Sequence, residues 1–139
     1  MKGRTTAVLA GGLIVAAALV SAAPVARASE AANKQLYLKY CGSCHGPDGK
    51  GDGVLSGVLQ TKPADLTQIA KKNGGEFPTA EVAKVINGSK TMRAHGDPDM
   101  PVWGEVFKQQ ASSGSSSRKS QAQAKIAFIT AYIKSIQEK

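Results

Sequence analysis

The sequence is short of several residue types on which small proteins depend. Among its 139 residues there are two Cys and two His, and Phe, Trp and Tyr together make up 5%. Two Cys rule out a framework of several disulfides, and so few large side chains leave little apolar volume for a core. No stretch alternates apolar and polar residues for long enough to predict a strand. The chain is therefore expected to be helical, with part of its apolar centre supplied from outside the polypeptide.

The N-terminal 28 residues have the pattern of a targeting segment. Two basic residues precede an apolar run over 7–23, and Ala26-Arg27-Ala28 has the A-x-A form of a signal-peptidase site. The alternative is an uncleaved membrane anchor, but the run is 17 residues rich in Ala and Gly, whereas a spanning helix needs about 20 strongly apolar residues. We therefore predict a cleaved signal peptide over 1–28, a periplasmic location, and one mature domain over 29–139 without a membrane span.

Removal of that segment leaves a basic protein. The mature chain has 15 Lys and Arg against 10 Asp and Glu, which is a net formal charge of +5 before any cofactor is added. Such a balance favours nucleic acid, anionic lipid or an acidic protein as partner. An exported protein is not expected to meet nucleic acid, and the charges are dispersed along the chain. Two interpretations remain, an ordinary solvated surface and docking to a protein with an acidic face.

Both Cys lie in one motif, Cys41-Gly42-Ser43-Cys44-His45. C-x-x-C-H is the pattern of covalent haem attachment. On a helical turn, two Cys three residues apart point their sulfurs the same way, so each can reach one vinyl group of a porphyrin. The adjacent His45 can then turn its imidazole towards the iron. We predict one haem c, attached through Cys41 and Cys44 with His45 as an iron ligand, and this haem would supply the missing apolar centre.

Three other interpretations of the motif are weaker. A thioredoxin-like redox pair follows a strand in a βαβ unit, and no strand–helix alternation precedes Cys41. A zinc site needs further ligands, but outside the motif the mature chain has no Cys and a single His, His95. A plain disulfide between the two Cys would leave the adjacent His45 unexplained.

Apolar periodicity predicts an all-α domain. In the last predicted helix four Ile recur at spacings of 3, 4 and 3, which indicates one buried face, and Phe128 and Tyr132 add an aromatic pair at i, i+4. Two further helices are predicted from shorter apolar stripes. The three segments are 33–40, 80–86 and 121–137.

Capping residues mark where other helical segments begin and end. Asp65, with Gln68 three residues later, has the form of a capping box for a segment that stops at Gly74-Gly75. Thr79 is predicted to be the N-cap of the helix over 80–86, which Asn87-Gly88 ends.

Two segments are predicted to be loops. Residues 46–53 contain four Gly, which suits positive φ angles and close approach of the backbone to a flat ligand. Residues 111–120 contain six Ser and one Gly, and they are predicted to form a flexible surface loop before the last helix.

The sixth iron ligand has few candidates. Met100 is followed by Pro101, which fixes the local backbone and removes a donor, so Met100 is expected in an extended loop that can lean over the haem. Met92 follows a helix end, where a Met is more often part of a core. His95 lies in a loop rich in Gly, Asp and Pro, where a His is more often exposed. We predict Met100 as the ligand, and Met92, His95 and an open iron position are the alternatives.

The sequence resembles class I cytochromes c, and most closely the small bacterial periplasmic type. In that family the motif His and a Met in a Met-Pro-x-Trp loop are the axial ligands, which correspond to His45 and Met100. The Ser-rich stretch 111–120 is a departure, because the family core does not require it. The segments that carry the likeness are CGSCHG at 41–46, GKGDG at 49–53 and DMPVWG at 99–104.

The resemblance implies that the terminal helices pack against each other around one covalently bound haem. It implies a one-electron carrier and not an enzyme, because both axial ligands stay on the iron in both oxidation states. A Met sulfur opposite a His favours ferrous iron. The resemblance also implies that the Pro63 carbonyl accepts a hydrogen bond from the second ring nitrogen of His45. We expect Trp103 to pack along the haem edge near a propionate.

Two other functions stay open. A catalytic or sensor haem needs an open or labile sixth position, against which Met100 argues. A haem-bearing subunit of a larger oxidoreductase would carry the same residues as a diffusing shuttle. In the shuttle interpretation the partners are redox proteins and the protein is expected to be a monomer.

Overall fold

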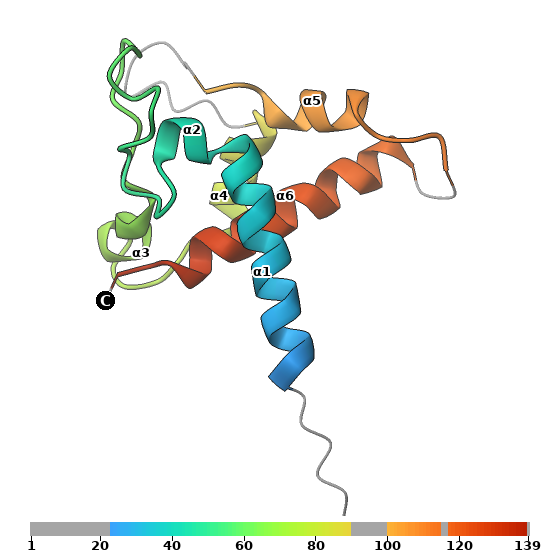
Figure 1. Cartoon of the computed structure of the whole chain (residues 1–139), viewed down its shortest axis with the longest axis horizontal. Helices are drawn as coiled ribbons and strands as arrows, with labels where there is room; N and C mark the ends of the chain where they lie inside the picture. The colour runs from blue at the N-terminus through green and yellow to red at the C-terminus, as the bar shows by residue number, and fades with distance from the viewer. Residues whose placement is uncertain (1–22, 90–99, 115–116, 139) are drawn as a thin grey trace, which may run out of the picture.

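The computed structural model describes residues 23–89, 100–114 and 117–138, and within these ranges all regular structure is helical (Figure 1). The predicted all-α fold is therefore confirmed. The elements in chain order are α1 (Ala23–Tyr40), α2 (Gly42–His45), the 3-10 helix η1 (Leu66–Gln68), α3 (Ile69–Lys72), α4 (Thr79–Asn87), α5 (Trp103–Gln109) and α6 (Arg118–Ser135).

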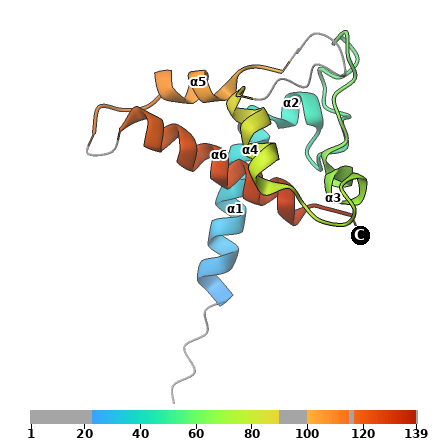
Figure 2. The ribbon, with the colours of Figure 1, turned by 180° about the vertical axis from the view of Figure 1, so that it is seen from behind.

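The centre of the fold is the crossing of α1 and α6, the first and last helices (Figures 1 and 2). The rings of Tyr37 and Tyr132 meet there with centroids 4.8 Å apart, and the side chain of Tyr37 is 0% exposed. Three of the four Ile that were predicted to form one face of α6 are buried, and the fourth, Ile136, packs against the same core. The expected packing of the terminal helices is thus confirmed. Helices α4 and α5 cover the rest of α6.

The two long helices begin earlier than their sequence patterns predict. Helix α1 begins at Ala23 and not at residue 33, because the Ala-rich residues before the apolar stripe have high helix propensity. The predicted cleavage boundary after residue 28 falls inside this helix, whose first turns project away from the other helices (Figure 1).

Helix α6 begins at Arg118, because the Ser117 side chain accepts a hydrogen bond from the Ser120 N–H and caps it. The prediction of a loop over 111–120 is therefore wrong for the last three of those residues. The predicted aromatic pair is also split, because Tyr132 is buried whereas Phe128 is 49% exposed.

Two of the predicted caps differ in detail. Asp65 does act as an N-cap, but its carboxylate accepts from the Thr67 N–H, and the Gln68 side chain does not return to it as a capping box requires. The N-cap residue of α4 is Pro78, and Thr79 is the first residue of the helix. No side chain makes a capping hydrogen bond at this end. At the other end of α4, Gly88 adopts the left-handed conformation expected of a C-cap.

Helix α5 was not predicted, because it has only seven residues and no side-chain cap marks where it begins after the Met100 loop. Phe107 is 0% exposed, and its ring lies 5.6 Å from that of Trp103 and 4.9 Å from that of Tyr40. This aromatic cluster joins α5 to the end of α1. In the part of the chain that the structure describes, no helix is long and apolar enough to cross a membrane.

Candidate haem site

The Cys-x-x-Cys-His motif forms one helical turn at the end of α1. The Cys41 N–H donates to the Tyr37 carbonyl at 2.8 Å, so the helical hydrogen bonding of α1 continues directly into the motif. The Cys41 carbonyl then accepts from the N–H groups of Cys44 and His45, at 3.2 and 2.9 Å. The two Cys and the His therefore share a single turn, as the spacing predicted, and no disulfide joins the two Cys.

A glycine loop returns the chain onto this turn. The Tyr37 hydroxyl donates to the Gly46 carbonyl at 2.8 Å, and burial raises the pKa of this hydroxyl, so it stays protonated. Further along, the Gly51 N–H donates to the His45 carbonyl at 2.8 Å. Gly46, Gly49 and Gly51 all have positive φ angles, which a residue with a Cβ adopts at a cost. The loop 46–53 thus has the positive φ angles that its Gly content predicted.

The His45 ring is fixed by a backbone carbonyl. Its Nδ1–H donates to the Ala64 oxygen at 2.9 Å. The prediction of Pro63 as the acceptor is wrong by one residue. The Pro63 carbonyl instead faces Gly51, so closely that a Cβ on Gly51 would collide with its oxygen. Burial lowers the pKa of His45, so the ring is neutral at pH 7. With Nδ1 engaged, Nε2 is the nitrogen that keeps a lone pair for a metal.

The Cys41 thiol does not have the character of a reactive redox thiol. Burial raises the pKa of the Cys41 thiol to about 12. Disulfide oxidoreductases show the opposite shift, because a low thiol pKa makes the attacking thiolate available. Among residues 23–89, 100–114 and 117–138, no three His, Cys, Asp or Glu side chains gather as a metal cluster.

Met100 is partly buried and packs against the hydrophobic core. It lies directly before α5, whose Trp103 contacts the ring of Tyr40 at 5.5 Å. The alternative ligands Met92 and His95 lie outside the described residues. Met100 as the sixth ligand, and Trp103 beside a propionate, stay predictions.

Sequence reasoning missed two residues of this site. Tyr37 falls within the predicted helix over 33–40 and was not identified as a site residue, although its hydroxyl donates to the glycine loop. Ala64 gave no signal, because any residue can supply a backbone carbonyl.

The residues present fit a covalently bound haem. The two thiols lie on one turn and are not joined to each other, and the imidazole beside them is neutral with one nitrogen held by the backbone. A carbonyl partner on the far nitrogen is the usual support of a metal-binding His.

The chain matches the family model described as cytochrome C oxidase, cbb3-type, subunit III, over residues 28–110. The match covers more than half of the chain and includes the Cys-x-x-Cys-His turn, the glycine loop and Met100; it ends before α6. Comparisons with curated proteins and with solved structures found no match. A domain of this kind implies covalently bound haem c and electron transfer. The chain therefore belongs to the cbb3-type subunit III family and is a class I c-type cytochrome.

Proposed function

We propose that the chain is a periplasmic mono-haem cytochrome c that carries one electron at a time between redox proteins. The observation that carries the proposal is the bond from His45 Nδ1 to the Ala64 carbonyl, at 2.9 Å. A carrier needs a coordination sphere that does not rearrange when the charge changes, and a ring held by backbone cannot rotate freely. Haem c, when bound, supplies the reversible one-electron couple.

The chain's own residues restrict what the site can do. His45 and Met100, as two side-chain ligands, would leave no position on the iron for a substrate, so the protein would transfer electrons without catalysing a reaction. A Met sulfur and a His nitrogen as the two protein ligands would raise the reduction potential relative to two nitrogen ligands. Cys41 and Cys44, as thioethers, would prevent loss of the group. Redox partners with an acidic face suit the net charge of +5 on residues 29–139.

Spectra of the exported protein test this proposal. Alkaline pyridine should give the spectrum of haem attached by two thioethers, and the ferric protein should show the far-red band of Met sulfur on iron. The ferrous protein should not bind carbon monoxide quickly. Rapid binding of carbon monoxide together with absence of the far-red band would refute the carrier and favour a catalytic or sensor haem.

A second candidate is a haem-bearing subunit of a larger oxidoreductase. It is favoured by the description of the matched family, which names an oxidase subunit. Salt dependence distinguishes the two. The electrostatic screening length falls from about 10 Å at 0.1 M to about 3 Å at 1 M, so electron transfer by a steered, diffusing carrier should slow as salt rises. A rate independent of salt, with copurification of a partner through gel filtration, would favour the subunit.

A further inference from the structure

The C-terminal tail binds the segment that begins at Ala64. After α6 ends at Ser135, the chain passes along η1 and α3, and the last described residues lie beside α3 in both views (Figures 1 and 2). The Gln137 side chain makes two bonds to this segment: its Oε1 accepts from the Ala70 N–H at 2.8 Å, and its Nε2 donates to the Leu66 carbonyl at 2.7 Å. The Glu138 N–H donates to the Thr67 carbonyl at 3.0 Å.

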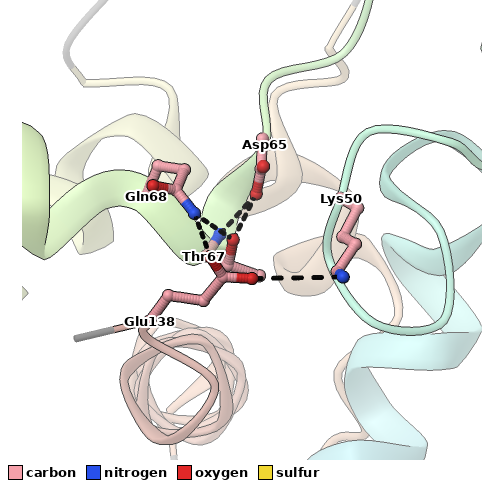
Figure 3. A network of polar contacts seen from close by, with 5 residues as sticks. All are labelled: Lys50, Asp65, Thr67, Gln68 and Glu138. Carbon is pink, nitrogen blue, oxygen red and sulfur yellow. Dashed lines mark hydrogen bonds and ion pairs between the residues drawn. The ribbon is translucent and has the colours of Figure 1, made fainter.

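Side chains add further polar contacts between the tail and this part of the chain (Figure 3). The Glu138 carboxylate accepts from the Gln68 amide at 2.6 Å and lies 4.0 Å from the Lys50 ammonium. The Glu138 and Lys50 side chains are 52% and 57% exposed, so their ion pair contributes little. The firm attachment is made by Gln137, which is partly buried, and by the backbone of Glu138.

The segment bound by the tail is too short in helix to be stable without tertiary contacts. Its two helical elements, η1 and α3, have 3 and 4 residues, and isolated helices need about 12–15 residues to be even marginally stable. Upstream, the Leu66 N–H donates to the Gly49 carbonyl at 2.7 Å, which is the segment's link to the glycine loop. The tail contacts the segment from Leu66 to Ala70, and Leu66 is two residues from the carbonyl that accepts from His45.

We propose that Gln137 is a positioning residue for His45, the residue that would bind the haem iron. Through Leu66 and Ala70 it holds the backbone so that the Ala64 carbonyl stays in line with the ring N–H. A strong bond at Nδ1 makes the imidazole more basic and stabilises ferric iron, whereas a loosened bond makes the ferrous form more favourable. The proposal rests on the proposed function, because it takes His45 as an iron ligand.

The test compares Gln137→Leu with Gln123→Leu in the exported protein with its haem attached. Gln123 is exposed on α6, so the control makes the same chemical change at a residue that does not contact the segment. Two quantities are measured, the exchange rate of the His45 ring N–H by NMR in the ferrous state and the midpoint potential. In Gln137→Leu we expect exchange to rise about tenfold, as local stability equivalent to one hydrogen bond is lost.

The potential should rise in the same variant. We expect the ferrous-to-ferric ratio at a fixed potential to increase about threefold, which is roughly 28 mV at 59 mV per tenfold for one electron. The control should match wild type in both measurements. If the Ala70 amide exchanges faster in Gln137→Leu while the ring N–H and the potential stay at wild-type values, the tail holds η1 and α3 only and the proposal is overturned.

A milder variant covers the case in which Gln137→Leu yields no folded protein. Gln137→Glu keeps an acceptor for Ala70 and loses the donor to Leu66 and Ile133, so the ring N–H should exchange faster than in wild type by a smaller factor. Only the exchange rate is compared here, because the added carboxylate charge lowers the potential by itself. A wild-type exchange rate in Gln137→Glu would overturn the proposal. Failure of the proposed function is recognised separately, because wild type itself would then lack haem-shifted resonances from the His45 ring.

Discussion

Gly51 lies where the glycine loop meets the segment that supports His45, and replacing it with Ala tests that contact. The φ angle of Gly51 is +75°, and an added Cβ would collide with the Pro63 carbonyl oxygen and lie 3.3 Å from the Ala64 carbonyl carbon. These are backbone atoms, which cannot rotate away as the end of a side chain can. Gly74 is the matched control, because its φ is +71° and a Cβ there would meet nothing within 4 Å.

The two substitutions separate conformational strain from steric conflict. Both place a Cβ in the left-handed region, which costs about 1–2 kcal/mol. Gly51→Ala must in addition move a packed backbone, for which overpacking of about 1–3 kcal/mol is the appropriate scale. We therefore expect a loss of unfolding free energy of about 1–2 kcal/mol in Gly74→Ala and about 2–5 kcal/mol in Gly51→Ala.

Denaturant unfolding of the protein with haem attached, followed by far-ultraviolet circular dichroism, measures both values. The Gly51→Ala variant should also show a raised midpoint potential, since movement of Ala64 weakens the bond from His45, whereas Gly74→Ala should not. Equal destabilisation of the two variants, with equal potentials, would refute the close contact between the glycine loop and the support of His45.

Three other predictions concern the haem ligands and a helix cap. Replacing Cys41 or Cys44 by Ala should weaken haem retention, and the double variant should release its haem under acid-acetone extraction; retention would contradict covalent attachment. Met100→Ala should abolish the far-red band, lower the potential and admit cyanide, whereas Met92→Ala should change none of these, and the reverse pattern would move the ligand to Met92. The pKa of Asp65 is lowered by hydrogen bonds from the neighbouring Thr side chain and backbone, so its stabilisation is full above the usual carboxyl pKa and is lost as the pH falls through the lowered value. Asp65→Ala should cost about 1 kcal/mol at pH 7, and urea unfolding from about pH 5 to 3 should show this difference from wild type shrinking; a difference constant with pH would contradict the cap.

The local geometry of the site could be predicted from the sequence because it depends on local spacing. Cys41, Cys44 and His45 share one turn whatever the rest of the chain does, and the Gly at 46, 49 and 51 allow positive φ without reference to any partner. The Ile stripe of α6 is local in the same sense, because helical periodicity alone places those residues on one face. These features were correctly predicted for that reason.

Other features depend on contacts between segments far apart in the chain, and only the tertiary structure decided them. The sequence could not distinguish Ala64 from Pro63 as the partner of His45, since both offer the same carbonyl group. Packing of Gly51 against Pro63 settled the choice. In the same way, Gln137 has no sequence signal as a support of this segment. An amide near a C-terminus can hold this backbone only because the fold brings it to groups 67 and 71 residues earlier in the chain.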